Sequence, residues 1–328
     1  MQQHFEIIGS GLHLPHRKLT ALDVDARANL PAGWTAEHTG VLERYECVAP
    51  ESLASMAESA IASAMHNAST SWRDVDLILD ASTCRHQPIP CNAATLQQRF
   101  GRDAEGIACM DVQSTCLGFI VALQVANALF GTGAYRHIVI VCAEAALLGV
   151  DWNEPESACL MGDGAAAVVL RRSDPRDGYF FAHQTFAQHH DVCQIRGGGH
   201  TLPVTTYTRE TDSAFRFHMD GPQLLRVAAK HLPPMTESLL RDAGLTPDAV
   251  HVVPHQAAPK ALSLIRRMLR FKSERFHNRV ATMGNLIAAS IPAVLHQCRT
   301  EGLLPKNDPV LLLGTSAGYS QAGLLFRM

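Results

Sequence analysis

Two runs of apolar residues without polar alternation constrain the fold of this chain more than any other feature. They read HIVIVC over His137–Cys142 and GAAAVVL over Gly164–Leu170. A strand with one face in water alternates polar and apolar residues, whereas a strand without alternation belongs to a sheet that is covered on both faces. The sequence therefore predicts an α/β protein with helices packed on each side of a sheet.

The order of elements around these strands is repeated in the second half of the chain. Each half is predicted to run helix, strand, helix, strand, helix, strand, strand, with mostly parallel sheets. The polar stretch Arg171–Asp177 separates the copies, so we expect halves of residues 1–173 and 174–328. In the second half, we expect Pro233 and Pro234 to break a helix and Asn278–Thr282 to form a strand.

The predicted elements of the first half are Ser52–His66, Val75–Ala81, Asn92–Phe100, Gly106–Val112, Leu117–Phe130, His137–Cys142 and Gly164–Leu170. Those of the second half are Gln223–Ala243, Val250–Pro254, Pro259–Arg270, Asn278–Thr282, Leu286–Gln297, Val310–Gly314 and Gln321–Arg327.

Composition restricts the classes of function that the chain can have. Of its 328 residues, 47% are hydrophobic and 18% are charged, which is enough apolar material for a large core. A net charge of -3 excludes a strongly basic nucleic-acid binder, and an aromatic content of 6% argues against a base-stacking surface. No apolar run reaches the roughly 18 residues of a membrane span, so we expect a soluble protein.

The cysteines and the first residues indicate a cytoplasmic protein. Nine cysteines are scattered without a CxxC pair, which fits a reducing compartment and gives no zinc signature. The start MQQHFEIIGSG lacks the charged and apolar regions of a secretory signal. We expect neither a metal nor a cofactor.

Cys116 is the first candidate for chemistry. It lies between a predicted strand that ends at Val112 and a buried helix that begins at Leu117. A thiol at a helix N-terminus is stabilised as thiolate by the helix dipole and by free N–H groups. The competing interpretation is a buried core cysteine.

His255 and Asn285 are expected to lie near Cys116. His255 follows the strand Val250–Pro254 at its carboxyl end, where α/β sheets collect ligands, although a structural histidine is the alternative. Asn285 opens the helix Leu286–Gln297, which is the duplicated twin of the helix that Cys116 opens, and it also suits an ordinary N-cap. If a pseudo-twofold axis relates the halves, the two helix N-termini meet and the three side chains converge.

The segments that carry these residues resemble the thiolase-like condensing enzymes, and most closely the 3-oxoacyl-acyl-carrier-protein synthase III family. They read STCLGF around Cys116, VPHQA around His255, GNLIAASIP around Asn285 and MGDGAA from Met161. They follow the order of the family over nearly the whole chain. The resemblance implies a duplicated five-layered α-β-α-β-α fold and an acyltransferase that acts as a homodimer.

The resemblance also implies a mechanism. Cys116 would take an acyl group from an acyl-CoA or acyl-carrier-protein thioester. His255 and Asn285 would hydrogen-bond the carbonyl of a malonyl thioester while CO2 leaves, and the N–H groups of Cys116 and Ala317 would form the oxyanion hole. The product would enter fatty-acid or polyketide synthesis.

Contacts with coenzyme A and the acyl carrier protein are implied at two places. Trp34 stands where the family stacks adenine, and His38 stands where the family commonly has an arginine. The helix after His255 carries basic residues for carrier docking, with a solvated helix surface as the alternative interpretation; they are Lys260, Arg266, Arg267 and Arg270.

Several departures from the family pattern suggest a specialised enzyme. Ala258 replaces an asparagine, and Ser316 and Ala317 stand in a segment that is usually glycine-rich. Their side chains are expected to narrow the pocket or to tilt the N–H of the oxyanion hole. His38 and the lack of a basic residue in Val150–Trp152 indicate weakened recognition of coenzyme A, which favours delivery of the acyl group by a carrier protein. The loop Thr83–Pro90 stands where the family lines the acyl pocket of the partner subunit.

Two alternative functions stay open at this point. The first is acyl transfer to an alcohol or amine with His255 as general base, which would depend less on Asn285. The second is a non-catalytic partner in a heterodimeric synthase. Such a partner would not need Cys116, His255 and Asn285 together, so condensation is the favoured function.

Overall fold

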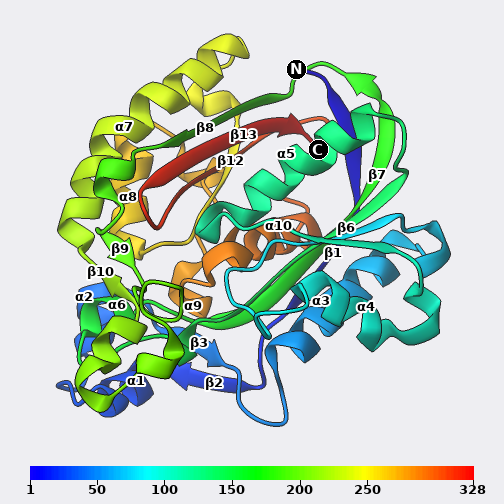
Figure 1. The fold of residues 1–328 in the computed structure, drawn as a ribbon. Coiled ribbons are helices and arrows are strands. Elements are labelled where there is room, and N and C mark those ends of the chain that lie inside the picture. The colour runs from blue at the N-terminus through cyan, green and yellow to red at the C-terminus, as the bar shows by residue number, and fades with distance from the viewer.

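Two mixed sheets and three layers of helices form the molecule, as a computed structural model that describes all of residues 1–328 shows (Figure 1). The first sheet contains, in spatial order, β1 (Gln3–His13), β7 (Asp163–Arg176), β6 (His137–Ala145), β4 (Leu77–Asp80) and β5 (Ala108–Asp111). The second sheet contains β11 (His251–Pro254), β12 (Pro309–Ser316), β13 (Ser320–Arg327) and β8 (Phe180–Thr185).

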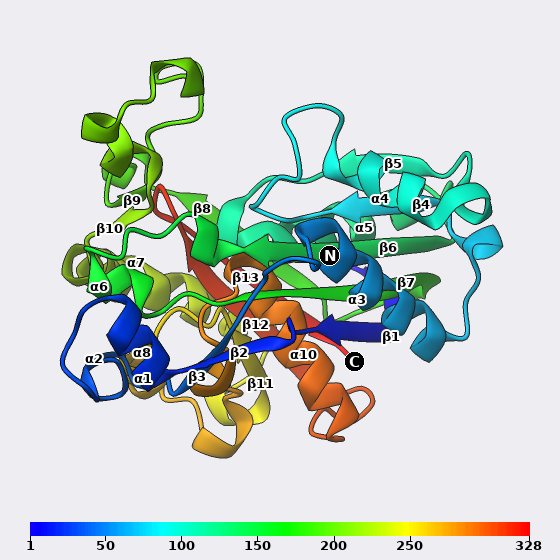
Figure 2. The ribbon, with the colours of Figure 1, turned by 90° about the horizontal axis from the view of Figure 1, so that it is seen from below.

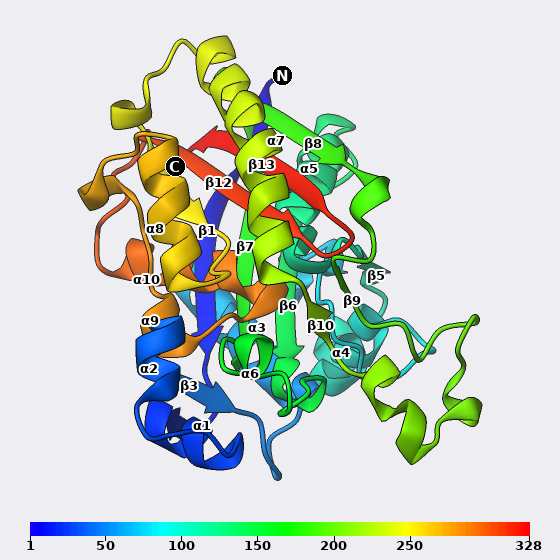
Figure 3. The same cartoon turned by 90° about the vertical axis from the view of Figure 1, so that its left-hand side faces the viewer.

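The helices lie in three layers around these sheets. The central pair, α5 (Gly118–Gly131) and α10 (Ser290–Thr300), packs against strands of both sheets. The outer face of the first sheet is covered by α3 (Leu53–Ala68) and α4 (Asn92–Phe100), and that of the second by α7 (Gly221–Asp242) and α8 (Pro259–Met268) (Figures 1 and 3). The five-layered α/β fold that the resemblance implies is confirmed.

Short elements complete the chain. They are β2 (Arg17–Thr20), α1 (Ala21–Arg27), α2 (Trp34–Thr39), β3 (Glu43–Glu46), α6 (Pro155–Ala158), β9 (Cys193–Gln194), β10 (His218–Met219) and α9 (Val280–Met283). Most of residues 196–213 form an exposed loop that projects from the body of the molecule (Figures 2 and 3). No helix has both the length and the apolar character that crossing a membrane requires.

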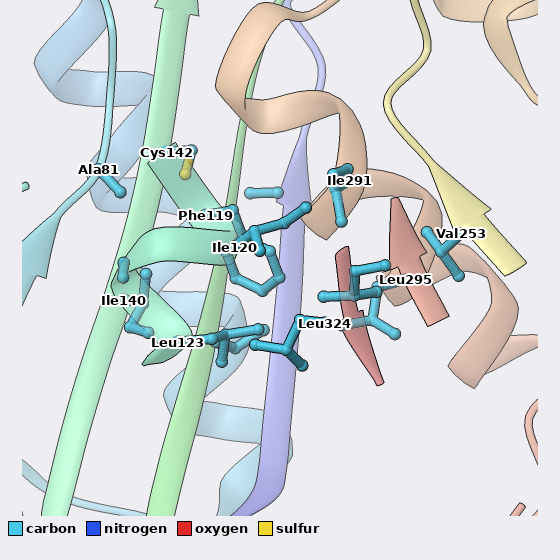
Figure 4. Packing of buried hydrophobic residues seen from close by; sticks show 14 of the residues in the cluster. Ala81, Phe119, Ile120, Leu123, Ile140, Cys142, Val253, Ile291, Leu295 and Leu324 are labelled. Atoms are coloured by element: carbon cyan, nitrogen blue, oxygen red, sulfur yellow. The ribbon is translucent and has the colours of Figure 1, made fainter. Parts of the chain in front are cut away.

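The central layer is the core of the molecule. Phe119 and Leu123 of α5 pack with Ile291 and Leu295 of α10 and with Leu324 of β13, in a cluster of 34 buried residues (Figure 4). Because α5 has a sheet on each side and α10 beside it, its sequence is apolar nearly all round. Each large side chain buried here stabilises the fold by about 1.5–3 kcal/mol, so the two central helices are held firmly.

The duplication is visible strand by strand. The strands β4, β6, β7 and β1 of the first sheet correspond to β11, β12, β13 and β8 of the second, with the same neighbours and directions. The counterpart of β5 is reduced to one isolated parallel bridge between Val252 and Phe276.

The prediction of a strand over Asn278–Thr282 is wrong, since Val280–Met283 forms the short helix α9. The buried side chain of Gln256 explains the difference. Its Nε2 donates to the carbonyl of His277 at 3.3 Å, and its Oε1 accepts the N–H of Arg279 at 2.7 Å. The Gln256 side chain therefore hydrogen-bonds backbone groups that would otherwise pair with a neighbouring strand.

The expected break in the helix at Pro233 and Pro234 is wrong, since α7 is continuous through both residues. The carbonyls that lose their helical donors belong to Ala229 and Lys230, which are exposed and can be solvated. Strand β7 continues to Arg176, and the chain passes from the first sheet to the second at residues 177–179.

The two ends of the chain are joined by one side chain. Gln3 Nε2 donates to the carbonyl of Arg327 at 2.9 Å, and the Arg327 N–H donates to Gln3 Oε1 at 3.0 Å. The termini consequently lie near each other on the same side of the molecule (Figure 1). The first strand of one sheet and the last strand of the other are thereby linked.

Candidate active site

Cys116 lies in a tight 3-10 turn, Thr115–Leu117, that leads directly into α5. Thr115 has a left-handed φ of 45°, and its N–H donates to Oε1 of Gln113 at 2.9 Å. A Cβ at Gly118 would lie 2.2 Å from the carbonyl oxygen of Ala81, so only glycine lets the helix start this close to the sheet. The turn thus places Cys116 at the carboxyl end of β4.

A second turn of the same kind, Ile287–Ala289, leads into α10 and positions Asn285. Ile287 has a φ of 47°, and its N–H donates to Oδ1 of Asn285 at 2.9 Å. The Oδ1 atom also lies 3.5 Å from the hydroxyl of Ser290. Because these contacts engage the amide oxygen and the NH2 group makes no hydrogen bond to the protein, the NH2 group remains available as a donor.

The two turns confirm the expected meeting of helix N-termini. A Cβ at Gly118 would approach the Cβ of Ala288 to 3.5 Å, so the turns touch. The twin of Cys116 in the second half is Ala288, and the twin of Asn285 is Gln113. Asn285 therefore precedes its helix by a whole turn and is not an ordinary N-cap.

His255 is buried at the end of β11. Its ring is 5% exposed, and Nδ1 has no hydrogen-bond partner. The His255 N–H donates to the carbonyl of Leu313 at 2.8 Å, and Gly314 leaves only enough room for the His255 Cβ. Burial lowers the pKa of the imidazole to about 4, although a backbone contact with Ile287 opposes this shift. The ring is therefore neutral and borders the turn that follows Asn285.

The environment of the Cys116 sulfur favours the thiol. Burial raises its pKa well above the ordinary value, and the nearby Cys193 and Glu144 raise it further. The N–H groups of Ala317 and Cys116 itself act on the sulfur in the opposite direction. Desolvation therefore outweighs the N–H groups that act on the sulfur.

Ala317 lies in the tight hairpin between β12 and β13, next to Gly318 with a left-handed φ of 64°. The Ala317 N–H thus lies close enough to the Cys116 sulfur to lower the pKa of the thiol, and the oxyanion hole stays a prediction. The preceding residue, Ser316, points its hydroxyl at Thr115 and at the carbonyl of Ser114. The hydroxyl of Ser316 is thus held against the turn that precedes Cys116.

Glu144 is a buried residue near the site that the sequence did not single out. It lies in β6 and accepts the N–H groups of Thr83 at 2.7 Å and Cys84 at 3.0 Å. Burial raises the pKa of its carboxyl to about 7. It anchors the loop Thr83–Pro90, whose Ile89 side chain is 83% exposed. A carboxylate inside an apolar strand, HIVIVCAEA, was the only available signal.

Trp34 and His38 form a stacked pair on α2. Their ring centroids are 4.3 Å apart with an interplanar angle of 9°, and His38 Nδ1 lies 3.0 Å from the carbonyl oxygen of Trp34. One face of the indole that would stack on adenine is therefore already covered by a side chain of the same helix.

The four basic residues after His255 differ in exposure and in the contacts that they make. Lys260 and Arg267 are exposed and lie two turns apart on the same face of α8. Arg266 turns its guanidinium back to the carbonyl of Phe271 at 3.1 Å. Arg270 is exposed beyond the end of the helix.

Comparison with known proteins places the chain among condensing enzymes. Residues 110–188 match the family described as 3-Oxoacyl-[acyl-carrier-protein (ACP)] synthase III, and residues 240–328 match its C-terminal part. The beta-ketoacyl-[acyl-carrier-protein] synthase III of Rhodospirillum centenum is 32% identical, with 98% of each chain covered. That of Aquifex aeolicus is 28% identical, with 98% of this chain and 99% of the relative covered.

Solved structures show the same likeness. The structure of 3-oxoacyl-[acyl-carrier-protein] synthase III from Aquifex aeolicus covers 100% of both chains with a TM-score of 0.88 and 26% identity. The priming beta-ketosynthase from the R1128 polyketide biosynthetic pathway shares the fold, with a TM-score of 0.88 and 23% identity over 100% of this chain and 97% of that chain.

Proposed function

Because the chain belongs to the 3-oxoacyl-[acyl-carrier-protein] synthase III family and is an acyltransferase of that type, we propose that Cys116, His255 and Asn285 carry out its decarboxylative condensation. The observation that supports this assignment most strongly is the free NH2 group of Asn285. It lies on a turn that touches the turn of Cys116, and the neutral ring of His255 borders the same place.

The first half-reaction loads the enzyme. The Cys116 sulfur attacks the carbonyl of an acyl thioester, the thiol proton passes to the departing thiol, and the acyl group becomes a thioester of Cys116. Negative charge on the carbonyl oxygen is stabilised by the N–H groups of Cys116 and Ala317. One such donor is worth about 3–4 kcal/mol in the transition state.

The second half-reaction forms the carbon–carbon bond. The bond between the malonyl carbon and its carboxylate breaks, CO2 leaves, and the electron pair forms an enolate on the thioester. Neutral His255 and the NH2 group of Asn285 donate hydrogen bonds to the enolate oxygen. The enolate carbon attacks the acyl-Cys116 carbonyl, and the Cys116 sulfur leaves and regains a proton.

The substrates are an acyl thioester and a malonyl thioester, and we propose that an acyl carrier protein delivers the acyl group. The stacked His38 covers Trp34 where adenine would bind, which weakens recognition of coenzyme A. Lys260 and Arg267 offer two positive charges on one helix face to an acidic carrier. Arg266 is engaged elsewhere and contributes less.

The low pKa of His255 also separates condensation from acyl transfer to an alcohol or amine. The alternative reaction needs a base that takes a proton near neutral pH, and a general base works best with a pKa near the working pH. A His255 with a pKa of about 4 is a poor base but retains a neutral N–H as a donor. Condensation is therefore the better match.

Intact-protein mass spectrometry tests this function. The native chain and Cys116→Ala are mixed with matched acyl-CoA and acyl-carrier-protein thioesters, and malonyl-carrier protein is then added. We expect an acyl adduct on the native chain only, faster loading from the carrier, and discharge of the adduct with release of CO2. Discharge by an alcohol or amine but not by the malonyl donor would favour acyl transfer, and absence of any adduct would contradict both enzymatic functions.

A further inference from the structure

Two hydroxyl groups join the turn of Cys116 to the hairpin of Ala317. Ser316 Oγ hydrogen-bonds Thr115 Oγ1 and also lies 3.3 Å from the carbonyl oxygen of Ser114. Ser316 is only 6% exposed, so bulk water competes little for its hydroxyl. Thr115 immediately precedes Cys116, and Ser316 immediately precedes Ala317. Each hydroxyl is thus one residue away from an N–H group that acts on the Cys116 sulfur.

The duplicated fold shows that this hydroxyl pair is not needed to form the turn. Thr115 and its twin Ile287 adopt nearly the same left-handed φ, 45° and 47°, which is unfavourable for a β-branched residue. In both halves an amide oxygen two residues earlier accepts the N–H at 2.9 Å. Ile287 has no hydroxyl and forms the turn nevertheless. The turn itself therefore does not require the Thr115 hydroxyl.

The pair joins two elements that lie far apart in the sequence and already pack against each other, since a Cβ at Gly314 of β12 would lie 3.1 Å from the side chain of Leu117. Thr115 belongs to the first half and Ser316 to the second, and no covalent connection of fewer than 200 residues joins them. The spacing between the Cys116 N–H and the Ala317 N–H depends on how the hairpin sits on the turn. The hydrogen bond between the two hydroxyls lies one residue before each of these N–H donors. It therefore restricts the distance between them directly.

We propose that the Thr115–Ser316 hydroxyl pair is a positioning device that sets the spacing of the two N–H donors of the oxyanion hole. This inference rests on the proposed function, because it assumes that an oxyanion forms at Cys116. Misplacement of reacting groups by about 1 Å can cost on the order of 10²-fold in rate, so we expect the pair to influence the rate and not the binding of the acyl donor.

The test compares acylation with alkylation of Cys116. The probe for acylation is p-nitrophenyl hexanoate: Cys116 takes the hexanoyl group, p-nitrophenolate leaves, and water then hydrolyses the thioester to free the thiol. Both of these steps pass through an oxyanion. The probe for alkylation is iodoacetamide, whose substitution at carbon with loss of iodide does not. For Thr115→Val and Ser316→Ala we expect the kcat for ester cleavage to fall by about 10- to 100-fold. We expect KM and the alkylation rate to stay within about twofold of the native values, since neither depends on oxyanion geometry.

A double-mutant cycle and a rescue sharpen the result. The variant with both substitutions should be no slower than the slower single variant, because one interaction is lost only once. Thr115→Ser keeps the hydroxyl and should retain near-native kcat. The matched control is the hydroxyl pair of Thr185 and Ser320, 2.8 Å apart on neighbouring strands of the same sheet, whose removal by Thr185→Val and Ser320→Ala should leave kcat unchanged.

The outcomes distinguish the inference from the proposed function. If the native chain is alkylated at Cys116 but never acylated by the ester or by any thioester, the proposed function fails. If the native chain is acylated, three results would refute the positioning role and leave the pair merely structural. The hydroxyl variants could keep native kcat, the losses of the two single variants could add in the double variant, or alkylation could fall as much as acylation.

Discussion

At the scale of single residues, the duplicated amides Gln113 and Asn285 show how one local structure serves two purposes. Each side-chain oxygen accepts an N–H two residues later. The Nε2 of Gln113 faces the carbonyl of Thr83 at 3.4 Å, whereas the NH2 group of Asn285 has no partner in the protein. Only the second amide is therefore equipped to bind a substrate carbonyl.

Asn285→Asp is expected to block condensation while the fold survives. The variant keeps the oxygen that holds Ile287 but replaces the NH2 donor by an acceptor with negative charge. Decarboxylation of a malonyl thioester should fall by about 10²- to 10³-fold, and acyl loading of Cys116 should remain within a few fold. Release of CO2 and the acyl mass adduct measure the two steps. Gln113→Glu is the matched control, and an equal loss in both variants would contradict the assignment.

The pH dependence of condensation provides a second test at this scale. Because burial lowers the pKa of His255 to about 4, the ring is neutral on both sides of its ordinary value of 6.5. We expect the rate of malonyl decarboxylation by the acylated enzyme to be flat through pH 6.5 and to fall only as the pH approaches about 4. A neutral donor role would be contradicted by a tenfold loss of rate per pH unit as the pH falls below 6.5. To be assigned to His255, this loss should be absent from His255→Asn and present in the surface variant His218→Gln.

The candidate residues of the site could be named from the sequence, whereas their surroundings could not. Cys116, His255 and Asn285 were singled out because each was expected where a strand ends or a helix begins, and because the segments around them resemble those of condensing enzymes. Their catalytic roles stay predictions. The resting state of Cys116, the orientation of Ser316 and the presence of Glu144 were not found. They depend on which elements lie next to each other in the folded chain, and this cannot be predicted from the local sequence.

At the scale of elements, the loop Thr83–Pro90 depends on the carboxyl of Glu144 at its base. Glu144→Gln leaves one of two N–H groups facing an NH2 group, so we expect a loss of about 1–3 kcal/mol in the free energy of unfolding. Urea unfolding measures this loss. Glu58→Gln, on the surface beside Arg99, is the control and should change stability little.

The loss in Glu144→Gln should depend on pH. The folded pKa of Glu144 is raised from 4.5 to about 7 by burial, with Asp80 as a further charge that raises it. The folded state then binds more protons than the unfolded state between these values, so native stability from this group falls as pH rises. The deficit of the variant should be largest at pH 4.5 and smaller at pH 7, and a deficit independent of pH would contradict the raised pKa.

The order of elements was predictable, and the errors have definite causes. Apolar periodicity identified the repeated α/β unit and both buried strands. The strand expected at Asn278–Thr282 failed because Gln256, far away in the sequence, captures its backbone groups. The break expected at Pro233 failed because solvent replaces the missing hydrogen bonds on the exposed side of α7.

At the scale of the whole molecule, one edge of the first sheet is unpaired and available for pairing with a second copy of the chain. β5 ends the strand order, and the exposed side chain of Met110 lies on this unpaired edge. An open edge with an exposed apolar side chain is a ready surface for another chain. We therefore predict that a second copy of the chain pairs with this edge at β5, with the loop of Ile89 beside it.

Met110→Lys is expected to dissociate this dimer. Light scattering after size-exclusion chromatography should give about twice 35.6 kDa for the native chain and 35.6 kDa for the variant, because a charge on the edge opposes pairing. Leu303→Lys is the matched control, since Leu303 is 38% exposed and Met110 is 41% exposed. A native monomer, or a dimer that survives Met110→Lys but not Leu303→Lys, would refute this interface.

The reciprocal hydrogen bonds between Gln3 and Arg327 have a consequence for the connectivity of the fold. With both ends of the chain at one place, a short linker from residue 328 to residue 1 closes the polypeptide into a ring. The exposed loop around Gly198 and Gly199 is then a suitable place to open it. A circularly permuted gene that starts there encodes every contact of the two sheets, with the nucleophile half translated last.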